Sequence, residues 1–358
     1  MPEGAYAQAG VDQGAAGRGV AALVEVLRGI DPGRESRAAL ASGHYASVLR
    51  LDERTGLALS CDGVGTKVLV AEQLGRFDTV GVDCVAMNAN DVVCVGAEPL
   101  AVLDYLAVEE PDPARLAALA EGLKRGAEQA GVEIPGGELA VMPELIRGHP
   151  SPRGFDLLGF CVGVVPLDSV VTGAAIEPGD AVIGLPSSGI HSNGLTLARR
   201  ALPDLLETLP DGRTVGETLL EPTVIYVRAA LELLRSELDL RGLAHITGEG
   251  LLNLLRLEAA VGYRIDAPLP DPPVFDLIAE RAGVEESEMW EVFNMGCGFC
   301  CVVAPSDAES AVALAERHHP GAAVIGRVTD RAGVVELPAA GLEGRRGEGF
   351  RPAPTANR

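Results

Sequence analysis

The chain has 358 residues, of which 47% are hydrophobic, and a formal net charge of −22 at pH 7. This length fits two domains, and this apolar fraction excludes an intrinsically disordered chain. The acidic charge argues against non-specific binding to nucleic acid or to an anionic membrane, because both are polyanions.

The sequence has no run of about 18 apolar residues that could span a membrane. Its first residues lack the basic and then apolar pattern of a secretory signal. We therefore expect a cytoplasmic protein with no membrane partner. The seven cysteines lie mostly in apolar runs, which predicts reduced, buried thiols. Cys297 and Cys300 have CxxC spacing, but without a second pair we favour packing over a metal or redox role.

The first 30 residues begin with a segment rich in Gly and Ala and then favour a helix over residues 20–27. A leader of this composition is typical of a flexible terminus. The alternative is a flap that becomes ordered over a ligand, with Asp12 as its polar contact.

An apolar strand ends at Asp62 and leads through a glycine-rich turn into an amphipathic helix. Gly63 and Gly65 allow backbone N–H groups to converge on an anion, and the helix start adds a positive dipole end. Asp62 is an oxygen ligand suited to Mg²⁺, and Lys67 offers a cation to phosphate oxygens. Thr66 and Lys67 close the turn, which does not fit a Walker A motif. A G-x-G turn alone is often only a turn, but an acid before it and a lysine after it favour phosphate binding.

Residues 78–97 predict a helix that is buried around most of its circumference. Asp83 and Asn90 lie seven residues apart and share one face, with Asp91 about 80° round from Asp83. Buried carboxylates need a partner, and a metal ion or a cation is the usual one. The alternative is that these side chains only cap or hydrogen-bond neighbouring loops.

The rest of the first half predicts two strands and a helix, over residues 99–108, 156–165 and 113–130. Residues 132–138 repeat the earlier design, with a short strand, paired glycines that include Gly137, and then an acid, Glu138. Turn residues and a change of pattern between residues 166 and 179 predict a domain boundary, so that residues 1–170 form the first domain.

A second small-residue loop, SSGIHSNG, follows a strand over residues 180–186 and precedes a helix that starts at Leu195. Its hydrogen-bonding groups suit a phosphate or a ribose, and its residues of interest are Ser187, Ser188, Gly189, His191, Ser192 and Asn193. Since imidazole titrates near neutral pH, His191 could act as an acid or a base, although a lone loop histidine is usually not catalytic.

A third glycine loop, in the sequence AHITGEG, contains Thr247 and Gly248. The other predicted helices cover residues 219–238, 251–257, 271–281, 285–293 and 305–319, and the other strands cover residues 243–250, 262–265, 294–303 and 322–328. Residues 171–340 thus form a second domain, and residues 341–358, rich in Gly, Arg and Pro, form a loose tail.

Each half therefore offers an anion site built from a strand, a glycine loop and a helix. One site is acidic with a lysine, and the other is rich in hydroxyls. The chemistry that fits is a magnesium–nucleotide acting on a second phosphorylated molecule. Positioning and charge neutralisation would carry it, rather than a protein nucleophile.

The ordered set of motifs resembles the phosphoribosylformylglycinamidine cyclo-ligase family, also called aminoimidazole ribonucleotide synthetase. From Tyr6 to about residue 328 the motifs read DGVGTK, GVDCVAMNANDVVCVGAEPLAVLDY, GFCVGVV, SSGIHSNG, EPTVIYV, AHITG and FNMGCG. The resemblance implies an N-terminal α+β domain that pairs through its strands in a homodimer, and a C-terminal α/β domain. It also implies a purine-biosynthesis ligase that uses ATP and Mg²⁺ to close the imidazole ring of formylglycinamidine ribonucleotide, with release of ADP and phosphate.

The resemblance also implies roles for residues. The metal ligands would be Asp62, Asp91 and Glu138, and the catalytic residues Lys67, Asp91 and His191. The nucleotide would contact Asp62, Gly63, Gly65, Thr66, Lys67, Asn90, Asp91, Gly137 and Glu138, with Asp83 in support. The substrate would contact Ser187, Ser188, Gly189, His191, Ser192, Asn193, Thr247 and Gly248.

The sequence departs from the family at several places. GGETAEMPG reads GGELAVMPE, so that Leu139, Val141 and Glu144 replace threonine, glutamate and glycine. TGGG reads TGEG, with Glu249 in the loop, and the ENxPR stretch is absent after Asn253. Two alternatives follow: a related enzyme, such as a thiamine monophosphate kinase, a selenophosphate synthetase or a hydrogenase maturation factor, and a non-catalytic nucleotide-binding module.

Overall fold

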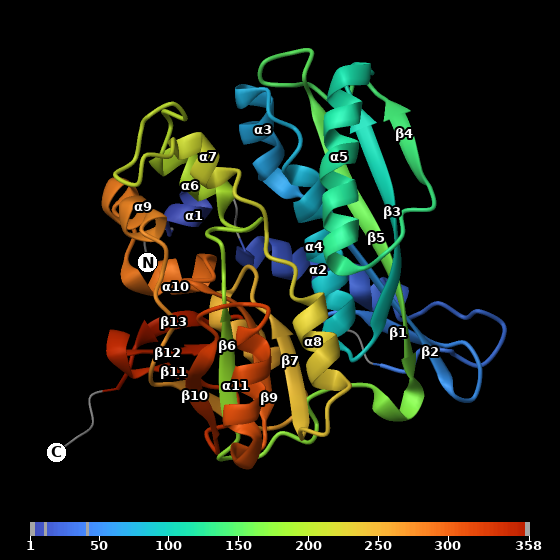
Figure 1. Ribbon diagram of the computed structural model, residues 1–358, viewed down its shortest axis with the longest axis vertical. Coiled ribbons are helices and arrows are strands. Elements are labelled where there is room, and N and C mark those ends of the chain that lie inside the picture. Colours follow the sequence, from blue (N-terminus) through green and yellow to red (C-terminus); the bar gives the residue numbers. More distant parts are fainter. Residues whose placement is uncertain (1–3, 11–12, 41–42, 355–358) are drawn as a thin grey trace.

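The computed structural model describes residues 4–10, 13–40 and 43–354. Its strands form two sheets from successive parts of the chain, with helices around both (Figure 1). The first sheet takes its strands from residues 47–166 and the second from residues 181–352. The expected two-domain architecture of helices and strands is confirmed, while the limits 1–170 and 171–340 stay predictions. Among the described residues, no helix has both the length and the apolar character needed to cross a membrane.

The first sheet has the strand order β1-β2-β5-β3-β4, in which only the β3–β4 pair is parallel. Its strands are β1 (Ser47–Arg50), β2 (Thr55–Gly63), β3 (Glu98–Val108), β4 (Gly137–Val141) and β5 (Phe155–Pro166). The helices of this half are α1 (Ala5–Gln8), α2 (Gln13–Leu27), α3 (Val68–Leu74), α4 (Val80–Cys94) and α5 (Pro113–Ala130).

Helix α4 is the centre of this half. All of its residues except Asp91 are buried, as its apolar sequence predicts. It packs between the sheet and α5, and Gly81 allows the close approach of α5, since a Cβ there would lie 2.2 Å from Leu123 N. Helix α5 follows its sequence signals closely: Asp112 caps its N-terminus through a 2.8 Å hydrogen bond from Arg115 N, and Gly131 ends it in a left-handed conformation.

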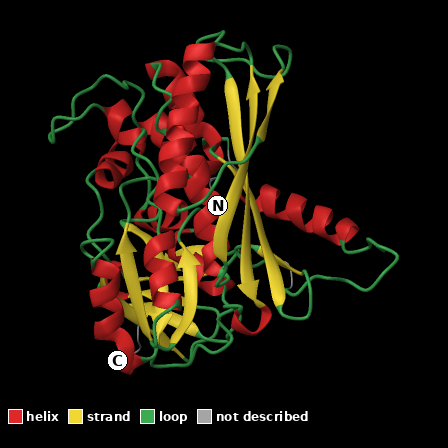
Figure 2. Ribbon diagram, turned by 45° about the vertical axis from the view of Figure 1, so that its right-hand side comes forward, coloured by secondary structure: helices red, strands yellow, loops and turns green. Residues whose placement is uncertain are grey.

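Within the described residues, the other face of the first sheet has no helix packed flat against it (Figure 2). Apolar side chains cross this face in rows, and the cross-strand pairs include Leu57–Val164, Leu59–Val162 and Leu103–Phe160. These residues are half-buried or exposed, whereas alternate residues such as Ala58 and Cys161 are buried. Helix α2 projects on this side, and its described side chains are exposed apart from Val24, which is half-buried.

The second sheet has the order β13-β12-β11-β8-β10-β6-β9-β7. Its strands are β6 (Ala181–Pro186), β7 (Leu240–His245), β8 (Gly262–Ile265), β9 (Cys297–Val303), β10 (Ala323–Thr329), β11 (Val335–Leu337), β12 (Leu342–Arg345) and β13 (Gly349–Pro352). Its helices are α6 (Leu195–Ala201), α7 (Val215–Leu219), α8 (Val227–Leu234), α9 (Val274–Ala282), α10 (Glu286–Val292) and α11 (Ala308–Glu316). The described strands pair antiparallel except β8 with β11, so this domain is a mixed sheet.

The expected loose tail is wrong for residues 342–352. These residues form the hairpin β12–β13, and β12 also pairs with β11. The side chains of Leu342 and Phe350 are buried, and Phe350 packs over Gly344. The burial of these two apolar side chains stabilises the hairpin although the segment is rich in Gly and Arg. Residues 355–358 lie outside the described residues.

The helix expected over residues 219–238 is interrupted. Helix α7 ends at Leu219 and α8 begins at Val227, and the segment between them, around Pro222, is irregular. At the N-terminus, α2 is longer than the expected helix over residues 20–27. Asp12, the expected contact of a flap, lies outside the described residues. All seven cysteines are free thiols, and the six other than Cys61 are buried.

Candidate active site

The first glycine loop folds as the sequence predicts, from a strand through a tight turn into a helix. Strand β2 ends at Gly63, and a 3-10 turn over Gly65–Lys67 leads directly into α3. Gly65 has a φ of 70°, a left-handed conformation that residues with a Cβ rarely adopt. Asp62 is thereby placed at the end of β2, where its Oδ1 accepts a 2.7 Å hydrogen bond from Gly63 N.

Two carboxylates, Asp62 at the end of β2 and Asp91 on α4, are near enough to influence each other electrostatically. Desolvation by surrounding protein atoms raises the pKa of Asp62, and the negative charge of Asp91 on α4 raises it further. The side chain of Asp91 is 17% exposed and Asp62 is exposed, so both can reach a ligand. Two carboxylates together with phosphate oxygens and water form a usual environment of Mg²⁺. The residues present therefore fit a magnesium–nucleotide.

His245, at the end of β7, contacts the carboxylate of Asp91 from the buried side. Its Nδ1 lies 2.9 Å from Asp91 Oδ1, and its Nε2 lies 3.4 Å from Asn90 Nδ2. The ring is fully buried. Sequence reasoning missed this residue, although the motif AHITG carried its signal.

Lys67 does not line an open phosphate cradle. It is fully buried, its Nζ lies 2.9 Å from Asp83 Oδ1, and it donates a hydrogen bond to the Glu221 carbonyl oxygen. The expectation that Lys67 offers a mobile cation to phosphate oxygens is therefore wrong for this structure, because a protein carboxylate already neutralises its charge.

The buried polar residues of α4 hold the second domain. Asp83 Oδ1 accepts hydrogen bonds from Thr223 N at 2.7 Å, Thr223 Oγ1 at 2.6 Å and Ser192 Oγ at 3.2 Å. Asn90 Oδ1 accepts a 2.8 Å hydrogen bond from Tyr226 N. For Asp83 and Asn90 the alternative interpretation, hydrogen bonding to neighbouring loops, is confirmed. Thr223 is a second residue that sequence reasoning missed; it lies in the motif EPTVIYV.

The first and second glycine loops lie against each other. A Cβ on Gly65 would lie 3.9 Å from the Ser192 carbonyl oxygen, and Thr66 Oγ1 lies 3.1 Å from Thr196 Oγ1. The two anion sites expected in separate halves of the chain are thus adjacent in space.

The third loop joins this group. A Cβ on Gly248 would lie 3.6 Å from Asn193 Oδ1. The Gly248 carbonyl oxygen accepts a 2.7 Å hydrogen bond from Asn253 Nδ2, which fixes the turn behind Thr247. Glu249 has a φ of 73° and its Oε2 lies 3.8 Å from Arg346 Nε, so this departure from the family pattern is partnered within the chain.

The hydroxyls of the second loop are largely engaged in holding it. Ser187 Oγ donates to Asn294 Oδ1 at 2.8 Å, and Ser188 Oγ donates to the Pro222 carbonyl oxygen at 2.6 Å. A cavity of about 510 Å³ opens beside Ser188 and Gly189. Its walls combine apolar and charged side chains, among them Leu209, Arg213, Val274, Asp276 and Glu280. This cavity has room for a small-molecule substrate next to the loop.

His191 is a structural residue in this conformation. It is buried, has a φ of 61°, and its Nε2 accepts hydrogen bonds from Ser188 N at 3.2 Å and Val224 N at 3.4 Å. Burial lowers the pKa of His191 well below its ordinary value, with the nearby His245 and Lys67 adding to the effect. In this conformation Nε2 is occupied as an acceptor, and the acid–base role of His191 stays a prediction.

The expected metal ligands do not all meet in one chain. Glu138 lies on the edge strand β4, and its neighbour Gly137 shares a row with Asp104, Gly159 and Asp62 on β3, β5 and β2. At about 4.8 Å per strand, three steps separate the two edges by roughly 14 Å. Over residues 4–10, 13–40 and 43–354, no group of three or more His, Cys, Asp or Glu side chains could hold a metal ion. The expected trio of Asp62, Asp91 and Glu138 is wrong for a single chain.

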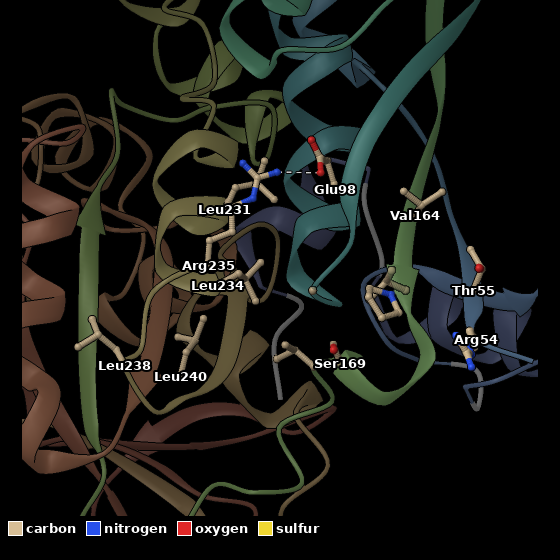
Figure 3. A pocket seen from close by; sticks show the side chains of 14 residues that line it. Arg54, Thr55, Glu98, Val164, Ser169, Leu231, Leu234, Arg235, Leu238 and Leu240 are labelled. Carbon is tan, nitrogen blue, oxygen red and sulfur yellow. Dashed lines mark ion pairs between the residues drawn. The ribbon is translucent and has the colours of Figure 1, made fainter.

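A groove of about 700 Å³ lies between the domains at the other end of β2 (Figure 3). Its walls include Arg54, Leu231 and Leu234, and Arg235 Nη2 lies 2.7 Å from Glu98 Oε2 across it. Because Thr55 at the start of β2 lines this groove and Asp62 is near the end of that strand, the groove is remote from the three loops.

Two family models together match most of the chain. Residues 43–165 match the family "AIR synthase related protein, N-terminal domain", and residues 177–337 match the corresponding C-terminal domain. The phosphoribosylformylglycinamidine cyclo-ligase of Methanothermobacter thermautotrophicus is 50% identical over 83% of this chain and 87% of its own length. That of Pyrococcus furiosus is 47% identical over 92% of this chain and 96% of its own length. The chain belongs to the phosphoribosylformylglycinamidine cyclo-ligase family.

Among solved structures, the hydrogenase maturation protein HypE in complex with ATP matches with a TM-score of 0.60 and 23% identity, over 80% of this chain and 83% of that one. At this identity the likeness shows a shared fold.

Proposed function

We propose that the chain catalyses the reaction of its family: ring closure of formylglycinamidine ribonucleotide to aminoimidazole ribonucleotide in purine biosynthesis, with conversion of ATP to ADP and phosphate. The observation that carries this proposal is 47–50% identity to cyclo-ligases over most of the chain. The adjacency of the glycine loops supports it, because the reaction transfers a phosphoryl group from a nucleotide to a ribonucleotide bound beside it. We also propose that the chain acts in the cytoplasm.

The chemistry requires that an amide oxygen become a good leaving group. Transfer of the γ-phosphoryl group of ATP to the formyl oxygen forms an O–P bond and releases ADP. The amidine nitrogen then attacks the same carbon, the C–O bond breaks, phosphate leaves and the nitrogen loses a proton. Catalysis then depends on alignment. Gly65 beside Ser192 would bring the nucleotide loop against the substrate loop.

We propose that Asp62 and Asp91 bind Mg²⁺ together with ATP. The bound ion would neutralise charge on the phosphate oxygens. The chain would supply the two carboxylates and the backbone N–H groups of the first glycine loop. Desolvation, and then the charge of Asp91, raise the pKa of Asp62, which supports this assignment because a bound cation would offset both effects.

We propose that two copies pair through the open face of the first sheet. The rows of apolar side chains on that face support this pairing, because contiguous exposed apolar surface usually marks an interface. In such a pair, a second copy would present its own Glu138 near the face that also carries Gly63, since residue 138 lies in the same row as Tyr105, Leu158 and Gly63. Glu138 would then join the metal site from the partner subunit.

The test is the purified full chain with ATP, Mg²⁺ and formylglycinamidine ribonucleotide, with detection of the aminoimidazole product and of ADP. We expect equimolar product and ADP. Release of ADP only with another acceptor, such as thiamine monophosphate or selenide, would replace this proposal with one of a related enzyme. No ADP above background with any acceptor would favour a nucleotide-binding module.

A further inference from the structure

The contact between His245 and Asp91 joins the two domains at the candidate metal site. His245 is the last residue of β7 in the second sheet, and Asp91 lies on α4, which packs on the first sheet. The 2.9 Å distance between His245 Nδ1 and Asp91 Oδ1 is that of a good hydrogen bond. Asp91 is the one residue of α4 that is not buried, so its other oxygen can face the site.

The neighbours of His245 fix which nitrogen carries the proton. Asn90 Oδ1 accepts the hydrogen bond from Tyr226 N, and Asn90 Nδ2 donates to the Val224 carbonyl oxygen at 2.9 Å. These two bonds set the orientation of the Asn90 amide, so its Nδ2 points an N–H group at His245 Nε2, 3.4 Å away. His245 Nε2 must then be the acceptor, and the proton lies on Nδ1.

An imidazole that donates from Nδ1 orients the carboxylate that accepts the hydrogen bond. One lone pair of Asp91 Oδ1 is occupied and the rotation of the carboxylate is restricted, while the exposed side of Asp91 stays available to a cation. The ring itself is confined: it is fully buried, and the ring of Phe299 lies 6.4 Å away between centroids.

We infer that His245 is a positioning residue that sets the Asp91 carboxylate for the metal–nucleotide, and that the second domain thereby tunes metal binding by the first. This inference rests on the proposed role of Asp91 as a metal ligand. The same strand continues into the loop with Thr247 and Gly248, so the position of the substrate loop and the orientation of a metal ligand depend on one segment.

The test measures binding of Mn²⁺, as a spectroscopic substitute for Mg²⁺, to the purified full chain with a non-hydrolysable ATP analogue, by electron paramagnetic resonance titration. His245→Phe keeps an aromatic ring but removes the donor, and we expect it to weaken Mn²⁺ binding by about tenfold or more. His245→Asn places an amide N–H near the former Nδ1, and we expect it to restore most of the affinity. His245→Gln, whose amide reaches toward Nε2 instead, should not.

Two controls separate the possible failures. His319→Asn changes a histidine whose ring packs at a tilt against Tyr226, 4.9 Å away between centroids, and should leave Mn²⁺ affinity unchanged. Asp91→Asn tests the proposed metal ligand itself. If Asp91→Asn weakens Mn²⁺ binding and folded His245→Phe does not, the positioning role is overturned. If neither variant changes the affinity, the proposed metal site is wrong. If His245→Phe does not fold, the Mn²⁺ affinities of His245→Asn and His245→Gln are compared instead. Equal affinities of these two variants would overturn the inference.

Discussion

Helix α4 carries two polar clusters that differ in their access to solvent. Around Asp83 the side chains are sealed: Lys67, Thr223 and Ser192 all bond to the same carboxylate oxygen, and both Asp83 and Lys67 are fully buried. Around Asp91 the carboxylate has one buried partner, His245, and keeps an open side. The same residue types on one helix can thus lock two domains together or, as proposed for Asp91, remain open to a ligand, and the two environments differ in burial.

Removal of the cation from the sealed cluster should have the largest effect. Lys67→Met keeps much of the side-chain volume but leaves Asp83 buried without its charge partner, and we expect a loss of about 3–5 kcal/mol in the free energy of unfolding. Urea denaturation measures it. Lys124→Met, at a lysine that is 62% exposed, should change stability by less than about 0.5 kcal/mol. Unchanged stability with loss of turnover would instead mean that Lys67 meets the nucleotide.

The open cluster should respond in activity rather than stability. Asp91→Asn keeps an oxygen for His245 but removes the negative charge, and we expect kcat/KM to fall by about 100-fold or more. Steady-state assay of ADP release measures it, with Asp78→Asn, at an exposed ion pair with Arg125, as the matched control. Retained turnover in folded Asp91→Asn would remove Asp91 from the site.

The buried loop histidine should make stability depend on pH. The pKa of His191 is lowered on folding, so below about pH 6.5 the unfolded chain binds more protons than the folded one. Stability from this residue is therefore full above pH 6.5 and is lost as pH falls, at up to about 1.4 kcal/mol per pH unit. Urea unfolding at pH 7.5, 6.5 and 5.5 should show a shallower slope for His191→Asn, which tolerates the positive φ. Equal slopes would contradict the burial of a neutral ring.

The smallest effect on stability is expected from a substitution of Asp62, beside the open cluster. Without metal or nucleotide, Asp62→Asn removes repulsion with Asp91, and we expect the free energy of unfolding to rise by a few tenths of a kcal/mol, because solvent screens an exposed carboxylate. Thermal unfolding without Mg²⁺ and ATP measures this, and a drop in stability would argue against mutual repulsion. The same variant should lose activity.

Much of the fold could be predicted from local patterns. The helix over residues 113–130 has matching bounds because Asp112, Pro113 and Gly131 mark its ends, and β5 differs from the expected strand by one residue at each end. The hairpin near the C-terminus was not predicted, since the side chains that pack against it come from distant segments, with Leu252 beside Gly344 and Glu291 beside Gly349.

The sequence predicted the loops of the candidate site but not the contacts that bury Lys67 and His191. The glycine loops and Asp91 followed from residue type and spacing, and the structure brings those loops together. Whether Lys67 and His191 face solvent depends on Asp83, Glu221 and Val224, which come from distant segments. A charged or titratable residue in a loop therefore indicates a polar contact. Only the tertiary structure shows whether that contact is with a ligand or with another part of the protein.

The way α4 is held has a consequence for how ligands enter. Its polar residues bond to three separate segments of the second domain: the loop with Ser192, the segment with Thr223 and Tyr226, and the end of β7 with His245. A hinge motion that separates the two domains would have to break these bonds together and expose the buried Lys67–Asp83 ion pair to solvent. Ligand access should therefore come from local rearrangement of the rim loops, with the two bodies moving as a single unit throughout turnover.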